Sequence, residues 1–204
     1  MRLSLLMRGI DPLRITGQPE GEVASVCYDS RLCGEGSLFV AIPGLKTDGH
    51  AFIADAVSRG ARFIVHEGEL SSPTGVTAIA VRDSRRSLGI LGKNLFGDPS
   101  AEVCLLGVVG TNGKTTVTYL IESILRSAGH TVGVLGTVNY RYGGKTLAAP
   151  NTTPESFEMQ RVLREMADAG VTHVVAEVSS HAIDLKRVDD CAFDLGIFTN
   201  LTQD

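Results

Sequence analysis

A nearly uninterrupted apolar run at residues 103–109 leads through a short glycine-bearing segment into a helical pattern at about residues 114–128. A run without polar alternation is typical of a parallel strand that is buried on both faces. Parallel strands are joined by crossover connections, usually helices, so this junction predicts an α/β sheet.

The segment between strand and helix has the composition of a phosphate-binding loop, in the strand–loop–helix context that such a loop requires. Its glycines let backbone N–H groups converge on phosphate oxygens, and the helix N-terminus adds its dipole. We expect the Lys114 ammonium to reach the terminal phosphates and the Thr115 hydroxyl to ligate Mg²⁺. The predicted loop consists of Gly110, Thr111, Asn112, Gly113, Lys114, Thr115 and Thr116.

The loop departs from the strict pattern at one position, because Val108 stands where that pattern has its first glycine. The alternative is a glycine-rich turn with a solvated lysine, which the Gly-Lys-Thr-Thr ending and the strand-to-helix context disfavour. The glycines at positions 107, 110 and 113 do not form the G-x-G-x-x-G motif. Their spacing weakens the case for a dinucleotide-dependent oxidoreductase.

The 204 residues are enough for one large or two small domains. In the first part, short β-rich runs alternate with two helical patterns, which predicts a small α/β domain. A cluster of helix breakers at residues 96–100 predicts a boundary, which we place between residues 98 and 99. The β-rich runs lie at residues 23–28, 37–42, 61–66 and 76–81, and the helical patterns at about 50–59 and 84–96.

The second part, residues 99–204, is predicted to form a doubly wound, mostly parallel sheet. Pro154 suits the first turn of one of its helices and Gly170 the end of that helix. Open nucleotide-binding sheets usually have five or more strands, so we expect this sheet to be incomplete. The expected strands lie at residues 103–109, 131–138, 172–178 and 193–198, and the helices at about 114–128 and 154–169.

Composition and charge exclude several classes of protein. With 43% hydrophobic residues, and no apolar stretch of about 18 residues, the chain is predicted to be globular rather than disordered or membrane-spanning. The net charge of −4 argues against general binding to nucleic acid or anionic lipid, so a phosphate ligand needs a local site. Cys27, Cys33, Cys104 and Cys191 lack metal-site spacing, and we expect four free thiols in a reducing cytoplasm.

Residues 110–116 resemble the ATP-binding loop of the Mur ligases, whose variant of the phosphate-binding loop lacks the strict first glycine. The resemblance covers essentially the whole chain. It implies an N-terminal UDP-substrate-binding α/β domain at residues 1–98, a truncated central ATP-binding domain at residues 99–204, and a C-terminal ligase domain outside the chain. Further similar segments are 29–31 (Asp-Ser-Arg), 36–41 (Gly-Ser-Leu-Phe-Val-Ala), 151–154 (Asn-Thr-Thr-Pro), 177–182 (Glu-Val-Ser-Ser-His-Ala) and 198–204 (Phe-Thr-Asn-Leu-Thr-Gln-Asp).

The same resemblance implies an ATP-dependent carbon–nitrogen ligase of peptidoglycan synthesis, and hence a role in cell-wall biogenesis, cell shape and cell division. We expect it to add meso-diaminopimelate, rather than L-lysine, to UDP-N-acetylmuramoyl-L-alanyl-D-glutamate through an acyl phosphate. ATP and Mg²⁺ are the implied cofactors. The full-length protein is expected to be a cytoplasmic monomer that binds neither nucleic acid nor membranes. Residues 1–204 alone are expected to be inactive, because the amino-acid site would lie beyond Asp204.

Glu177 lies near the end of an apolar run, where a strand would bring its carboxylate to the carboxyl edge of the sheet, close to the loop. A carboxylate at this place also suits a helix cap or a solvated loop. Thr115 and Glu177 together offer oxygen ligands of the kind that Mg²⁺ prefers, and the resemblance implies that Glu177 is a magnesium ligand. Lys114 and Glu177 are the expected catalytic residues.

The resemblance also implies two groups of substrate-binding residues. Local chemistry alone would also allow Thr152 or Thr153 to cap the following helix, and residues 29–31 to form a polar turn. The Arg187 cation suits the D-glutamate carboxylate. The muramoyl peptide is assigned to Asn151, Thr152, Thr153, Ser179 and Arg187, and the UDP moiety to Tyr28, Ser30, Leu45, Lys46 and Thr47.

Two alternatives remain open. A folylpolyglutamate synthase-like ligase belongs to the same superfamily, but its loop usually reads Gly-Lys-Gly-Ser, and it lacks the uridine-binding domain that residues 22–96 resemble. A nucleotide-binding module without catalysis would bind ATP or a UDP-sugar and turn over neither.

Overall fold

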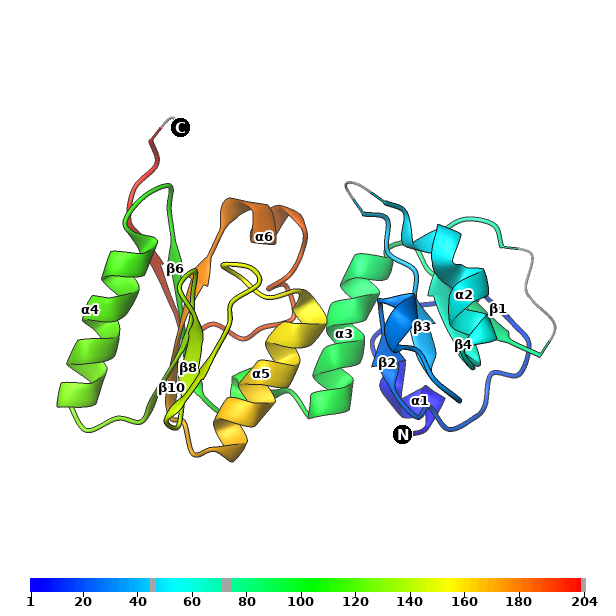
Figure 1. Ribbon diagram of the computed structural model, residues 1–204, viewed down its shortest axis with the longest axis horizontal. Helices are drawn as coiled ribbons and strands as arrows, with labels where there is room; N and C mark the ends of the chain where they lie inside the picture. Colours follow the sequence, from blue (N-terminus) through cyan, green and yellow to red (C-terminus); the bar gives the residue numbers. More distant parts are fainter. Residues whose placement is uncertain (45–46, 71–74, 203–204) are drawn as a thin grey trace. The chain divides into compact units, whose positions relative to one another are not determined.

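The computed structural model describes residues 1–44, 47–70 and 75–202, and it divides into two compact units, Met1–Leu95 and Phe96–Asp204. Each unit has a sheet of its own with helices packed on it, which confirms the predicted α/β class (Figure 1). The domain boundary that we place between residues 98 and 99 stays a prediction. Within the described ranges, no helix combines the length and the apolarity needed to cross a bilayer.

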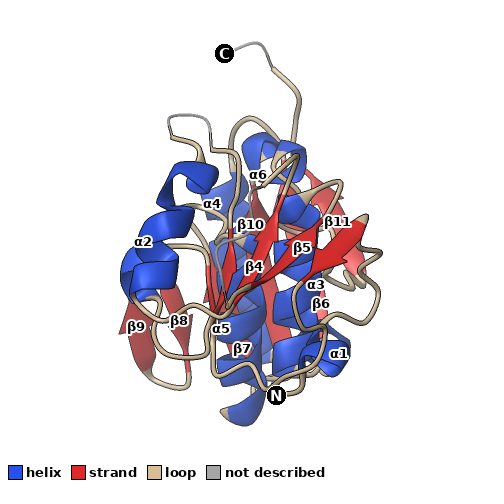
Figure 2. Ribbon diagram, turned by 90° about the vertical axis from the view of Figure 1, so that its right-hand side faces the viewer, coloured by secondary structure: helices blue, strands red, loops and turns tan. Residues whose placement is uncertain are grey.

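The first unit contains a five-stranded sheet in the order β1-β5-β4-β3-β2. Figure 2 shows β4 beside β5 in red. The parallel strands are β2 (Val26–Cys27), β3 (Leu38–Val40), β4 (Phe63–His66) and β5 (Thr77–Ala80), and β1 (Arg14–Thr16) runs antiparallel to β5. The helical elements are α1 (Leu3–Leu6), η1 (Ser30–Leu32), η2 (Gly49–Phe52), α2 (Ile53–Ser58) and α3 (Ser84–Phe96).

The central strands of this sheet are buried along their whole length. Every residue of β3 and β4 is buried, as expected for parallel strands covered on both faces. Phe39 and Ile64 share a core cluster with residues of α2. The Asn94 amide of α3 donates to the carbonyls of Leu6 (2.8 Å) and Arg8 (2.7 Å), and so ties α3 to the chain around the end of α1.

The second unit contains a six-stranded sheet in the order β11-β6-β10-β7-β8-β9. Four strands are parallel, and the last two form an antiparallel hairpin. The strands are β6 (Cys104–Val109), β7 (Val132–Leu135), β8 (Tyr140–Tyr142), β9 (Lys145–Leu147), β10 (His173–Val178) and β11 (Leu195–Phe198). The helical elements are η3 (Pro99–Ala101), α4 (Lys114–Ser127), α5 (Ser156–Asp168) and α6 (Ser180–Asp184).

Helices α4 and α5 cover opposite faces of this sheet, as the doubly wound prediction requires (Figure 1). Side chains alternate between the two faces along a strand. Val175 of β10 packs with Val117 of α4, whereas Val174 packs with Leu163 of α5. By the same alternation, the side chain of Glu177 lies on the α4 face, where the phosphate-binding loop ends.

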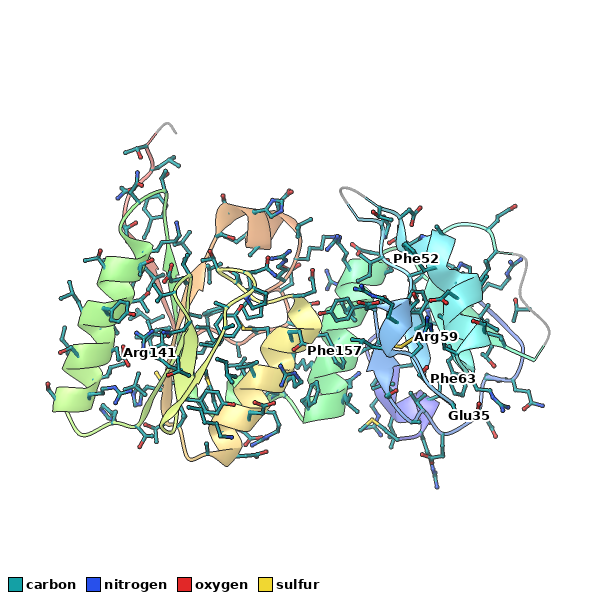
Figure 3. All side chains as sticks on the ribbon, viewed as in Figure 1. Glu35, Phe52, Arg59, Phe63, Arg141 and Phe157 are labelled. Atoms are coloured by element: carbon teal, nitrogen blue, oxygen red, sulfur yellow. A yellow bond between two sulfur atoms is a disulfide. The ribbon has the colours of Figure 1, made fainter. Side chains whose placement is uncertain are left out.

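A largely buried ion pair joins α4 to the hairpin. Arg141 of β8 pairs with Glu122 of α4 and lies over the Tyr119 ring, 4.2 Å from its centroid (Figure 3). The side chains of Glu122 and Arg141 are 10% and 15% exposed. Glu122 also pairs with Arg126 of α4 at 3.0 Å. Removing Glu122 would leave the desolvated Arg141 cation without this partner, so the pair fixes the hairpin against the helix.

Two sequence-based expectations for this unit are corrected. The sheet has six strands in the described residues rather than four, because Gly143 and Gly144, both with positive φ, reverse the chain between β8 and β9. The helix expected from Pro154 begins at Ser156, because Glu155 is still extended and its carboxylate accepts the Ser156 N–H as the N-cap. Neither Thr152 nor Thr153 caps this helix.

The expectation of four free thiols is also corrected. Cys27 and Cys33 form a disulfide, with Cα atoms 6.0 Å apart. The short helix η1 between them folds the chain back toward the end of β2, an approach that their spacing in the sequence does not reveal. Cys104 and Cys191 are free.

The packing of α5 can be tested at Leu163, which is fully buried. Leu163→Ala should lower the free energy of unfolding of the second unit by about 2–5 kcal/mol, because apolar burial is lost and a cavity remains. Denaturant titration measures this change. Leu120→Ala is the control, since Leu120 on α4 is 58% exposed and its truncation should change the free energy by less than about 0.5 kcal/mol. Equal effects of the two changes would contradict the observed packing.

Candidate functional site

The predicted phosphate-binding loop connects β6 to α4. Gly110 and Gly113 have positive φ values of 142° and 83°, and α4 begins at Lys114. A Cβ atom on Gly110 would collide with the Thr199 hydroxyl, so no larger residue fits there. Gly113 has no side chain to cap α4, which leaves the first N–H groups of the helix available to an anion.

Lys114 is held across this loop. Its Nζ atom donates to the carbonyl oxygens of Gly110, at 2.7 Å, and Thr111, at 3.1 Å. These contacts keep the ammonium beside the N-terminus of α4, where both groups attract phosphate oxygens.

The segment after β11 braces the loop. The Asn200 carbonyl accepts the Thr111 N–H (3.1 Å), and the Asn200 side-chain oxygen accepts the Asn112 N–H (3.0 Å). The Thr199 hydroxyl donates to the Asn112 carbonyl (2.7 Å), and the Thr111 hydroxyl donates to the Thr202 carbonyl (3.1 Å). Sequence reasoning missed these bracing residues, although a position directly after a parallel strand places them at the edge of the sheet that carries the loop.

The Glu177 carboxylate lies beside the loop and is 2% exposed. Its Oε2 atom accepts hydrogen bonds from the hydroxyls of Thr115 and Thr137, both at 3.0 Å, and its Oε1 atom accepts the Thr137 N–H at 3.3 Å. Gly136 makes room for this arrangement, because a Cβ atom there would collide with Oε1.

These contacts give Glu177 the character of a cation ligand. Within the described residues, every donor to Glu177 is neutral, although a buried carboxylate is costly unless a positive charge compensates it. Oxygens from Thr115 and Glu177 suit Mg²⁺, which binds to one or two carboxylates together with substrate phosphates and water. The described part of the chain has no group of three or more His, Cys, Asp or Glu side chains that could hold a metal alone. The residues therefore fit an ion that is shared with a nucleotide.

The loop predicted to contact the muramoyl peptide lies next to Glu177. The Thr152 hydroxyl is 3.1 Å from the Thr137 hydroxyl. Thr153 is 1% exposed, and its hydroxyl donates to the Glu177 carbonyl (2.9 Å) and accepts the Ser179 N–H (3.1 Å). The Thr153 hydroxyl thus joins this loop to the end of β10, and its contact with substrate stays a prediction.

Arg187, Ser179 and Asn151 surround the same loop. Arg187 Nη1 donates to the Thr153 carbonyl (3.1 Å), and its Nε lies 3.4 Å from the Glu155 carboxylate. The Ser179 hydroxyl oxygen accepts the N–H at the third position of α6 and caps that helix. The structure therefore brings these residues and Glu177 to one edge of the sheet, and their roles toward substrate stay predictions.

Tyr140 anchors the start of this loop. Its hydroxyl donates to the Asn151 carbonyl at 2.6 Å. Burial raises the pKa of Tyr140 to about 12, so the hydroxyl keeps its proton and the hydrogen bond persists at neutral pH.

In the first unit, a pocket of about 640 Å³ opens at the carboxyl ends of β2 and β3. Its lining includes three of the residues predicted to hold the UDP moiety, Tyr28, Ser30 and Thr47. The other two predicted residues, Leu45 and Lys46, lie outside the described residues.

Sequence reasoning missed two further residues of this pocket, Phe52 and Asp55. Phe52 is 43% exposed, so its ring is available to a ligand. Hydrogen bonds from Ser30 and Arg59 lower the pKa of Asp55, which keeps this carboxylate ionised at neutral pH. The available signal was an aromatic residue and an acidic residue within the helical pattern expected at about residues 50–59.

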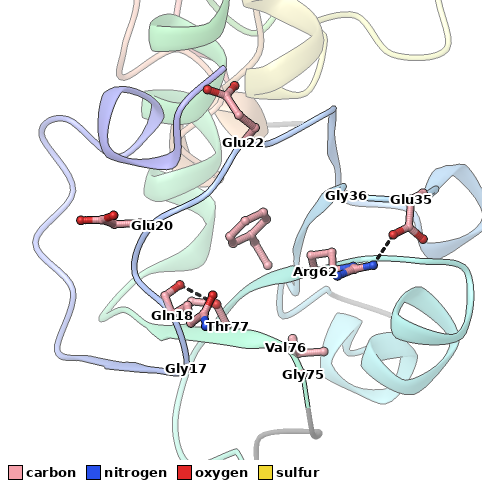
Figure 4. Close-up of a pocket in the computed structure, with 11 residues that line it drawn as sticks. Gly17, Gln18, Glu20, Glu22, Glu35, Gly36, Arg62, Gly75, Val76 and Thr77 are labelled. Carbon is pink, nitrogen blue, oxygen red and sulfur yellow. Dashed lines mark hydrogen bonds and ion pairs between the residues drawn. The ribbon is translucent and has the colours of Figure 1, made fainter.

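A second cavity, of about 500 Å³, opens at the amino ends of β4 and β5 (Figure 4). Glu20, Glu22 and Glu35 line it, and Arg62 pairs with Glu35. Acidic side chains repel phosphate, and the cation of this cavity is already paired. The pocket with Tyr28 also contains two acidic residues, Asp29 and Asp55, and its Arg31 is paired with Asp29. Its place at the carboxyl ends of the strands, where open α/β sheets bind ligands, favours it for a nucleoside diphosphate.

A phosphate-binding loop between a parallel strand and a helix, on a doubly wound sheet, defines a nucleotide-binding α/β protein. The Mur ligase middle domain matches residues 108–204, and a second domain, described as the Mur ligase family, catalytic domain, matches residues 22–94. The chain belongs to the Mur ligase family and consists of its N-terminal and middle domains.

The chain is 46% identical over 204 residues to the UDP-N-acetylmuramoyl-L-alanyl-D-glutamate–2,6-diaminopimelate ligase of Geobacter sulfurreducens, covering 100% of this chain and 40% of that protein. Identity to the ligase of the same name from Clostridium perfringens is 43%, with 100% and 42% covered. A solved structure of a ligase of this name has a TM-score of 0.83 at 25% identity, covering 100% of this chain and 41% of that chain.

The MurF ligase of Thermotoga maritima, solved in complex with ADP, shares the fold with a TM-score of 0.58 at 23% identity. That alignment covers 86% of this chain and 37% of the MurF chain. The chain spans about two fifths of the length of the relatives that it matches.

Lys114→Ala should weaken MgATP binding more than tenfold and leave the fold intact, because a charge-assisted contact to phosphate contributes about 1.5–3 kcal/mol. Isothermal titration measures the affinity. Lys145→Ala, which removes an exposed lysine of β9, is the matched control and should bind MgATP as the unmodified chain does. Unchanged affinity in Lys114→Ala would contradict the loop assignment.

Proposed function

We propose that this chain carries the ATP-binding and UDP-substrate-binding parts of a cytoplasmic, monomeric ligase that adds meso-diaminopimelate to UDP-N-acetylmuramoyl-L-alanyl-D-glutamate in peptidoglycan synthesis. The observation that carries the proposal is 46% identity along the whole chain to a ligase named for this reaction. The geometry of Lys114, Thr115 and Glu177 supports it, since these residues lie where a nucleotide and a cation are needed.

In this proposal, the side-chain carboxylate of D-glutamate attacks the γ-phosphorus of ATP, which gives an acyl phosphate and releases ADP. The amine of the incoming amino acid then attacks the acyl carbon, which forms the amide bond and releases phosphate. Lys114 and the first N–H groups of α4 stabilise the charge on the transferring phosphoryl group. Thr115 and Glu177 would hold Mg²⁺, which when bound would neutralise charge on the phosphate oxygens. Arg187 binds and orients the substrate carboxylate, which keeps it within reach of the phosphorus.

In the first unit, the UDP moiety is assigned to the pocket lined by Tyr28, Ser30, Thr47 and Phe52. The exposed Phe52 ring offers a face for base stacking, and the exposed Thr47 hydroxyl offers a donor to the diphosphate. The pocket therefore binds the substrate through its nucleotide.

The reaction itself is tested with the full-length chain, ATP, Mg²⁺, UDP-muramoyl dipeptide and one amino acid at a time. With meso-diaminopimelate we expect UDP-muramoyl tripeptide and phosphate in equal amounts, and with L-lysine little product. If neither amino acid gave ATP-dependent product, the ligase proposal would be overturned in favour of a nucleotide-binding module.

UDP alone should protect the backbone amides near Ser30 from hydrogen exchange. A ligand at a hundredfold excess over its Kd stabilises the bound state by about 2.7 kcal/mol, which slows local opening. Hydrogen exchange with mass spectrometry measures the protection, and MgATP is the control, since it should protect residues 110–116 instead. Protection by UDP confined to residues 110–116 would contradict the two-site assignment.

A further inference from the structure

Thr137 contacts both oxygens of the Glu177 carboxylate, although neither the loop motif nor the substrate-binding residues include it. Its hydroxyl donates to Oε2 at 3.0 Å, and its backbone N–H donates to Oε1 at 3.3 Å. Two donors from one residue, one on each oxygen, fix the rotation of the carboxylate about its last side-chain bond. Thr137 thus sets the direction in which Glu177 presents its lone pairs.

The same hydroxyl also connects Glu177 to the loop that carries Thr152. The oxygens of Thr137 and Thr152 are 3.1 Å apart. A hydroxyl has one proton, and Thr137 gives its proton to Glu177, so Thr152 must be the donor in this contact. A directed chain of hydrogen bonds therefore runs from Thr152 through Thr137 to Glu177, which Thr115 of the phosphate-binding loop also contacts at 3.0 Å.

The local backbone is shaped for this role rather than for packing. Strand β7 ends at Leu135, and Gly136 leaves the space that Glu177 Oε1 occupies. Thr137 itself is exposed, so the core does not depend on its hydroxyl. A substitution that keeps the β-branched shape of Thr137 therefore removes the hydrogen bond without disturbing the fold.

We propose that Thr137 is a positioning residue that orients Glu177 toward a divalent cation and couples the cation site to the loop that carries Thr152 and Thr153, the predicted peptide-binding loop. This inference rests on the proposed function. Groups that orient a ligand are needed for tight metal binding, because an unrestrained carboxylate loses conformational freedom when it binds the ion. The hydrogen bond that Thr152 donates to Thr137 polarises the Thr137 hydroxyl and makes it a stronger donor to Glu177. A substitution at Thr152 therefore affects Glu177 without direct contact.

The first test is the affinity of the full chain for Mn²⁺ at saturating ADP, measured from the electron paramagnetic resonance signal of the free ion. Thr137→Val should raise the Kd for Mn²⁺ by about tenfold, the effect of one lost hydrogen bond to a charged group. Thr137→Ser keeps the hydroxyl and should stay within about twofold of the unmodified chain. Unchanged Mn²⁺ affinity in Thr137→Val would overturn the positioning role.

The second test is a double-mutant cycle with Thr152→Val. If the hydrogen bonds act in series, Thr137→Val combined with Thr152→Val should weaken Mn²⁺ binding no more than Thr137→Val alone. Effects that multiply would overturn the coupling between the two sites. If the unmodified chain failed to bind Mn²⁺ with ADP, the proposed function itself would be overturned. Normal Mn²⁺ binding by Thr137→Val would overturn only the positioning role of Thr137.

Discussion

The buried carboxylate of Glu177 is the constraint on which the second unit's site depends. A charge that is 2% exposed must be compensated by its surroundings, and here three segments from different parts of the chain turn donors toward it or its backbone. Thr115 comes from α4, Thr137 from the segment after β7, and Thr153 from the loop before α5. The cost of burying one carboxylate therefore brings the predicted phosphate-binding loop and the loop that carries Thr152 and Thr153 to the same edge of the sheet.

The phosphate-binding loop has its own internal restraint. Asn200 already accepts the backbone N–H groups of Thr111 and Asn112, the second and third residues of the loop. The groups left for phosphate are the Lys114 ammonium and the N–H groups at the start of α4. Anion binding is thereby concentrated at the end of the loop that adjoins Thr115 and Glu177, where a shared cation would also lie.

Position in the sheet, rather than charge, distinguishes the two cavities of the first unit. Both are large enough for a small ligand, and each is lined by acidic residues and by an arginine that is already paired with one of them. The pocket at the carboxyl ends offers hydroxyls and an exposed aromatic ring. It also lies at the edge where open α/β sheets bind ligands.

The sequence by itself determined the features that depend on neighbouring residues. The unbroken apolar run predicted β6, the glycines and Lys114 predicted the loop, and apolar periodicity predicted α3 at Ser84–Phe96. Only the tertiary structure decided features that depend on distant partners. The three-residue strands β8 and β9 are too short for a periodic signal, and Thr137 and Asn200 acquire their partners only when separate strands end at one edge of the sheet. Hydrogen bonds between residues 40 or 88 positions apart leave no local pattern, because the fold rather than the spacing brings their atoms together.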